Sequence, residues 1–122
     1  EGLGSVELRR GEADALPLAD GEVQAAFAHM VLHYLPSPAE AIREMARALA
    51  RGGALVVVDF VRHEHEWMRE ELGVTWLGFE PEQVCDWLRE AGLPEPRAET
   101  RAAAGGSRSL PATFIASARR AP

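Results

Sequence analysis

The chain has 122 residues, which is enough for one domain with a buried core, and its 47% hydrophobic and 26% charged residues are typical of a globular protein. A formal charge of −6 disfavours a nucleic-acid partner, because duplex binding relies on basic side chains that neutralise phosphates. The single cysteine, Cys85, excludes an internal disulfide and fits a reducing cytoplasm. The longest apolar run is far too short to cross a bilayer, so we expect no membrane association.

The first predicted strand covers residues 5–10, in which Val6 and Leu8 alternate with polar neighbours. A loop with Pro17 and an Asp-Gly turn follows. Residues 23–35 begin as a second strand. Their apolar character on both faces is typical of a strand inside a parallel sheet.

A helix is predicted next, because Ser37, Pro38 and Glu40 form a capping-box pattern in which Glu40 reaches back to the first turn. An apolar stripe with helical spacing follows: Ile42, Met45, Ala46 and Leu49. Gly52 and Gly53 predict a left-handed stop. Residues 54–60 form a β-branched strand without polar alternation, so we expect helices on both of its faces and a parallel strand–helix–strand unit.

The second half of the chain predicts two helices and a strand pair. A polar helix covers about 64–72, and an amphipathic helix begins at Pro81 and stops at Gly92. Strands near 97–102 and 112–118 are expected to pair as an antiparallel hairpin with a long loop. The three tryptophans are interpreted as packing residues, although Trp76 could also cover a substrate pocket, and Cys85 as a small buried side chain.

Candidate chemistry lies where the strands end, because ligands of open α/β sheets bind beyond the carboxyl ends of the strands. Glu12 could accept hydrogen bonds from a ligand there, the alternative being a solvated turn carboxylate. His29 and His33 are four residues apart but lie where strand passes to loop, so a metal pair is disfavoured. The His-Glu-His-Glu run at 63–66 lacks zinc-motif spacing and reads as an acidic helix start. No metal site is predicted.

Taken together, these segments resemble the later half of a class I S-adenosylmethionine (SAM)-dependent methyltransferase. Residues 11–60 look like that family's third strand and adenine loop, its fourth strand with a "VLHHLPDP"-type ending, and its helix, Gly-Gly pair and fifth strand. Residues 63–93 are similar to a subgroup fused to repressor domains of the arsenical-resistance type.

The resemblance implies SAM as cofactor and a small-molecule methyl acceptor. It implies adenine contacts from Gly11, Glu12 and Ala13, with Glu12 where the family usually has Asp. It places Ala28, His29 and Met30 against the methionine part of the cofactor, and His33 matches the frequent histidine of that motif. The protein mainly holds donor and acceptor in line, and His29 or His33 is the candidate base if the acceptor must lose a proton.

The family's first two strands and its Gly-rich loop have no counterpart here. The expected fold is therefore the C-terminal part of a Rossmann-like methyltransferase sheet, one partial domain over 1–122, with an adenine loop and central unit in 1–60 and helices and strand pair in 61–122. Because bare strand edges invite pairing, we expect a fragment that missing N-terminal segments complete, or a homo-oligomer. Cofactor binding by the chain alone should be weak or absent.

Two other interpretations remain open. One is a non-catalytic dimerisation or regulatory module built on half of the fold. The other is half of a dinucleotide dehydrogenase, against which the missing glycine fingerprint argues.

Overall fold

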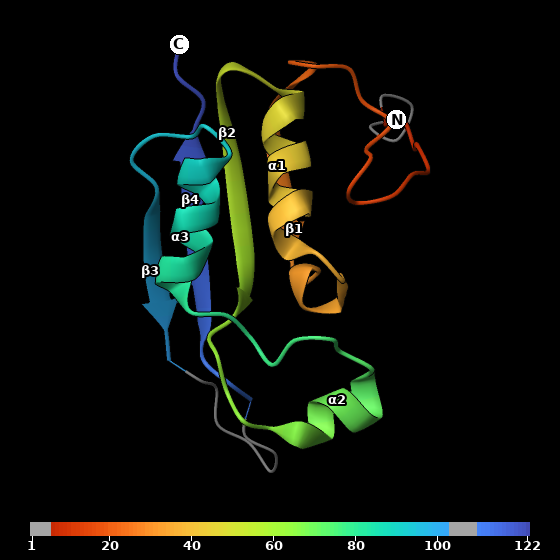
Figure 1. Ribbon diagram of the computed structural model, residues 1–122, viewed down its shortest axis with the longest axis vertical. Coiled ribbons are helices and arrows are strands. Elements are labelled where there is room, and N and C mark those ends of the chain that lie inside the picture. The colour runs from red at the N-terminus through yellow and green to blue at the C-terminus, as the bar shows by residue number, and fades with distance from the viewer. Residues whose placement is uncertain (1–5, 103–109) are drawn as a thin grey trace.

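A four-stranded mixed sheet forms the centre of the molecule in a computed structural model that describes residues 6–102 and 110–122. The strands lie in the order β1-β2-β4-β3 (Figure 1). Their bounds are Val23–His29 for β1, Leu49–Phe60 for β2, Arg97–Arg101 for β3 and Thr113–Arg119 for β4. The β1–β2 pair is parallel and the other two pairs are antiparallel, which confirms the parallel unit and the antiparallel pairing of the two C-terminal strands. The long loop expected between those strands falls mostly on residues 103–109, which lie outside the described residues.

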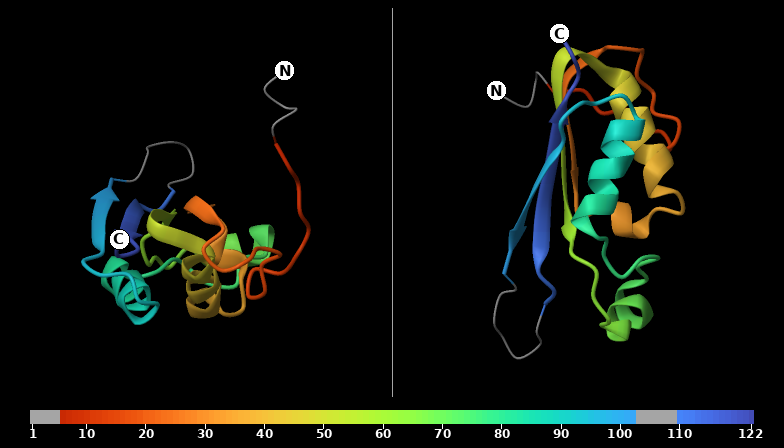
Figure 2. Two further views of the ribbon diagram at one scale, coloured as in Figure 1. Left: turned by 90° about the horizontal axis from the view of Figure 1, so that it is seen from above. Right: turned by 60° about the vertical axis from the view of Figure 1, so that its left-hand side comes forward.

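Two helices, α1 (Pro38–Ala48) and α3 (Pro81–Glu90), cover the same face of the sheet (Figure 2). Their apolar stripes and the inward residues of β2 and β4 form the core, which includes Ile42, Leu55, Val57, Leu88 and Phe114. The short helix α2 (Glu66–Leu72) lies beyond the end of β2, away from the sheet (Figure 1). Because β1 and β2 are parallel, their carboxyl ends lie at the same edge of the sheet, and the loops that follow them begin side by side.

The predicted strand at 5–10 is wrong for the residues that the structure describes. Residues 6–10 have no strand conformation, and Leu8 is 93% exposed. The segment runs outside the sheet (Figure 1), where Arg9 donates to the Pro17 carbonyl and to Glu22. An alternating pattern becomes a strand only where a neighbouring strand accepts its hydrogen bonds, and this segment has none.

The second predicted strand ends earlier than expected. β1 stops at His29, and Met30 has a left-handed φ of 56° that breaks the extended backbone. The apolar residues that follow form a single 3₁₀ turn, Leu32–Tyr34, instead of continuing the strand. β1 is also an edge strand in the described part of the chain, and Ala28 is its one buried residue.

The helix α1 has its expected start but neither expected cap. Ser37 occupies the N-cap and Pro38 the first turn, yet the Ser37 side chain makes no capping hydrogen bond and Glu40 pairs with Arg43. The helix ends at Ala48, four residues before Gly52, and Leu49 already begins β2. Gly53 is instead required by close packing, because a Cβ there would lie 2.9 Å from the Gln24 carbonyl oxygen.

The second face of the sheet is not covered by helices of the described residues, contrary to the expectation for residues 54–60 (Figure 2). Buried and half-buried positions alternate along β2, and the half-buried ones include Val56 and Val58. Phe27 pairs with Val56 on this face and is 71% exposed. We call the apolar surface made by Phe27, Val56, Val58 and Ile115 the open face. Both helices pack on the opposite side. The apolar side chains on this face of β2 are therefore not covered by α1 or α3.

Candidate functional site

A buried histidine–aspartate pair lies at the carboxyl end of β2. Nδ1 of His33 is 2.6 Å from Oδ1 of Asp59, and the two residues are 4% and 0% exposed. The Asp59 carboxylate also accepts the backbone N–H groups of His33, at 3.3 Å, and of Phe60, at 2.8 Å. The pair therefore joins the turn after β1 to the end of β2. These donors satisfy the buried carboxylate, which would otherwise be costly to remove from water.

A short segment, residues 73–79, which we call the strap, is hydrogen-bonded to the turn that carries His33. The backbone N–H groups of Thr75 and Trp76 both donate to the His33 carbonyl, and the indole N–H of Trp76 donates to the Leu35 carbonyl at 2.7 Å. Phe79 forms an isolated parallel bridge with Val61, just after β2. The strap thus fixes the backbone of the turn that carries His33.

Two aromatic rings contact His33, and further ring contacts continue from one of them to the histidines after β2. Its ring stacks on Phe60 with centroids 5.6 Å apart and contacts Tyr34 at 4.4 Å. Phe60 in turn contacts His63, which lies 5.2 Å from His65. Burial lowers the pKa of His63 below its ordinary 6.5, and the neighbouring imidazoles of His65 and His33 lower it further. His63 is therefore held in the neutral form.

The adenine-loop prediction falls on a tight turn, not on the end of a strand. The backbone N–H of Ala15 donates to the Glu12 carbonyl at 3.0 Å, and the Glu12 side chain is exposed. Gly11 is required sterically, because a Cβ there would lie 2.5 Å from Cδ of Pro17. A small pocket of about 90 Å³ opens beside this turn, lined by Glu12, Ala13, Asp14, Leu35, Pro36, Ser37 and Ala41. It joins the turn to the segment that follows His33.

Two side chains of α1 hold this loop in place. Arg47 donates to the Leu18 carbonyl at 2.7 Å and pairs with Asp20 and Glu44. Glu44 accepts the backbone N–H of Leu16 at 2.7 Å. The Arg47 guanidinium keeps the pKa of Glu44 below its ordinary value, so Glu44 remains a charged acceptor for the loop.

The remaining predicted cofactor residues lie apart from that pocket, at the end of β1. Ala28 is buried in the core on the helix-covered face, so only its backbone could contact a ligand. His29 pairs with Val58 and is exposed on the open face, while His33 turns into the other side toward Asp59. The structure therefore separates the two histidines that the sequence treated as equivalent.

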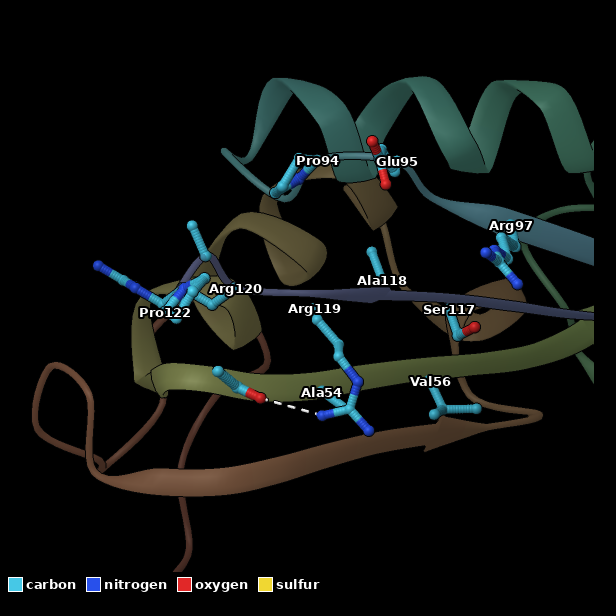
Figure 3. Close-up of a pocket in the computed structure, with 12 residues that line it drawn as sticks. Ala54, Val56, Pro94, Glu95, Arg97, Ser117, Ala118, Arg119, Arg120 and Pro122 are labelled. Atoms are coloured by element: carbon cyan, nitrogen blue, oxygen red, sulfur yellow. Dashed lines mark hydrogen bonds between the residues drawn. The ribbon is translucent and has the colours of Figure 1, made fainter.

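A pocket of about 770 Å³ lies beside the first part of β2 and the end of β4, away from the carboxyl end of β2 (Figure 3). It is bordered by Arg97, Ser117 and Arg119 on the open face, and Arg119 donates to the Gly52 carbonyl at 3.0 Å. Ligands of parallel sheets bind at the carboxyl ends of strands, so its place argues against a catalytic role. The smaller pocket beside Glu12 is chemically the better candidate.

Asp59 is the candidate residue at this site that the sequence analysis missed. It is the one acidic residue in an apolar run that was interpreted only as a buried strand, and a carboxylate at the end of such a run is itself a signal, because burying it requires donors. Cys85 is buried as expected, and burial raises its pKa. Within residues 6–102 and 110–122, no cluster of side chains has metal-binding geometry, and no helix there is long and apolar enough to span a membrane.

Comparison with known proteins gives this arrangement a family context. Residues 1–57 match a family model described as a methyltransferase domain. An uncharacterised chloroplast methyltransferase of Arabidopsis thaliana is 37% identical over 59 residues, which are 48% of this chain and 17% of that protein. The chain spans only 16% to 17% of the length of two curated relatives that it matches.

Solved structures extend the similarity to nearly the whole chain. A methyltransferase structure from Bacillus halodurans is 17% identical, covers 96% of this chain and 78% of its own, and has a TM-score of 0.74. A SAM-dependent methyltransferase from Thermotoga maritima is 22% identical, with 94% and 64% covered and a TM-score of 0.73. The chain therefore has the Rossmann-like fold of SAM-dependent methyltransferases. Similarity to the repressor-fused subgroup stays a prediction.

Proposed function

We propose that this chain is part of a SAM-dependent methyltransferase that acts on a small molecule. The observation that carries the proposal is the methyltransferase-domain match of residues 1–57, supported by a fold shared with SAM-dependent enzymes. The match includes the Glu12 turn and the residues that lead to His33, which are the segments where the family resemblance places the cofactor.

The pocket beside Glu12 fits the adenine end of SAM. Ala13, Leu35 and Pro36 give it apolar walls, and the exposed Glu12 carboxylate is free to accept a hydrogen bond from an exocyclic amine at its rim. The backbone N–H of Ala13 is the proposed donor to the ring, and Gly11 lets the turn pack against Pro17.

The end of β1 is the proposed contact for the methionine part of SAM. Ala28 would contribute through its backbone, and His29 and Met30 through side chain or backbone, because the left-handed Met30 turns the chain away from the sheet there. When bound, SAM supplies a methyl group on a sulfonium. The residues of this chain would hold the acceptor in line with that group, and His29 or His33 would take a proton if the acceptor has one to lose.

We also propose that the free edge of β1 and the open face are covered in the functional protein. A strand from upstream segments of the same polypeptide, or a second copy of this chain, would satisfy that edge. The cytoplasmic location, and a single partial domain with units at 1–60 and 61–122, belong to the same proposal. A non-catalytic module remains the second candidate, favoured by the unpartnered β1 edge.

Calorimetric titration with S-adenosylhomocysteine tests the proposed site. We expect saturable binding that Glu12→Ala weakens by roughly tenfold or more, because a hydrogen bond to a charged group contributes about 1.5–3 kcal/mol. Glu90→Ala removes an exposed carboxylate at the end of α3 and should leave the affinity unchanged. The isolated chain should bind more weakly than the gene product that contains it. No saturable binding by either would contradict the proposal and favour the non-catalytic module.

A further inference from the structure

The Asp59 carboxylate determines which nitrogen of His33 carries a proton. Both of its oxygens accept backbone N–H groups, Oδ1 from Phe60 and Oδ2 from His33 itself. The remaining contact is with Nδ1 of His33, at 2.6 Å. A carboxylate that only accepts hydrogen bonds requires Nδ1 to be the donor, which leaves the lone pair of the neutral ring on Nε2.

The rest of the cluster keeps the ring in this orientation. Phe60 stacks on one side of it, Tyr34 contacts it from the adjacent position, and the strap holds the His33 carbonyl through two N–H groups. No residue in the described part of the chain hydrogen-bonds Nε2. Every buried side-chain nitrogen or oxygen there has a hydrogen-bond partner, so the unbonded Nε2 must be accessible from outside. Nε2 is therefore the ring nitrogen that remains open to a ligand.

His29 has no comparable support. It is exposed on the open face, and no hydrogen bond to another described residue orients its ring. An imidazole acts efficiently as a base only when its orientation and tautomer are fixed. The two histidines thus differ in the property that a base requires.

We infer that Asp59 is a positioning residue that presents Nε2 of His33 as the proton acceptor, so that the methyl acceptor is a hydroxyl, thiol or protonated amine. This inference rests on the proposed methyltransferase function. In the step, the acceptor heteroatom bonds to the methyl carbon while the carbon–sulfur bond breaks and its electron pair stays on sulfur. The proton of a hydroxyl or thiol passes to Nε2 as the heteroatom attacks, and that of a protonated amine passes there before the attack, which frees the nitrogen lone pair. The resulting imidazolium is stabilised by Asp59.

The first test is independent of catalysis. Long-range ¹H–¹⁵N spectra of histidine-labelled protein at neutral pH should show His33 protonated at Nδ1 and bare at Nε2. The groups that face the ring are Asp59 from β2, His63 from the following loop and Tyr34 beside it. Asp59→Asn, which preserves volume, should abolish the fixed tautomer. A wild-type ring protonated at Nε2 would overturn the inference.

The second test uses methyl transfer by the gene product that contains this chain. His33→Gln and Asp59→Asn should lower kcat by about 10²–10⁴-fold with little change in KM or in S-adenosylhomocysteine affinity. His65→Gln, which changes an imidazole outside the pair, should leave kcat near the wild-type value. Full activity of His33→Gln, with the cofactor still bound, would refute the base role alone. If the wild-type protein neither binds the cofactor nor methylates any hydroxyl, thiol or amine acceptor, the proposed function itself is refuted.

Discussion

Gly78 shows how a single residue lets the strap pack against the chain that follows β2. Its φ is 76°, in the left-handed region, and a Cβ there would lie 2.4 Å from the Val61 carbonyl oxygen. Gly73, at the other end of the strap, has a similar φ of 71° but no atom within 4 Å of a Cβ. Of these two glycines, Gly78 alone combines an unfavourable conformation for other residues with a close backbone contact.

We predict that Gly78→Ala destabilises the protein clearly more than Gly73→Ala. The left-handed conformation costs about 1 kcal/mol at either site, and the clash at Gly78 adds roughly 1–3 kcal/mol because backbone atoms must move. Urea unfolding measures both free energies. Equal losses in the two variants would mean that the strap does not pack against Val61.

At the level of elements, α1 organises the loop that carries Glu12. The loop has no strand of its own in the described structure, and its position depends on Arg47 and Glu44, which bind backbone groups of Leu16 and Leu18. Such contacts between a helix and a loop can replace sheet hydrogen bonds in positioning a ligand site.

We predict that Arg47→Met lowers the free energy of unfolding by about 1–3 kcal/mol, because it leaves the half-buried Glu44 without its ion-pair partner and two loop carbonyls without their donor. Arg43→Met on the same helix breaks only an exposed pair with Glu40 and should cost less than about 0.5 kcal/mol. Chemical denaturation measures both, and amide exchange over residues 11–22 should accelerate in Arg47→Met alone. Unchanged exchange would contradict the role given to α1.

For the whole molecule, the main feature is the asymmetry between its two faces. Helices α1 and α3 cover one face (Figure 2), and Phe27 on β1, the edge strand of the described sheet, is exposed on the other. An apolar face next to an unpaired strand is a common site of association between chains.

We predict that the isolated chain self-associates at micromolar concentrations and that Phe27→Glu shifts it toward monomer. Leu72→Glu places the same charge on an exposed leucine of α2 and should leave the association unchanged. Light scattering coupled to size-exclusion chromatography measures the mass of each. A monomeric wild-type chain would contradict pairing between copies.

Local patterns predicted most elements because their signals are local. The stripe on α1 and the Pro81 start of α3 depend on neighbours a few residues apart, and both elements formed. The strand at 5–10 did not, because a strand also needs a partner that its own sequence does not contain. The candidate site was predicted in part, since His33 was identified but its partner Asp59, 26 residues away, was not.

The sequence by itself determined the α/β class and the parallel β1–β2 unit, because periodicity and turn residues act over short distances. The tertiary structure decided the rest. It placed His33 against Asp59, put His29 on the other face and left that face open. Those outcomes depend on which surfaces pack together and on where a buried charge finds its donors, and no local pattern contains that information.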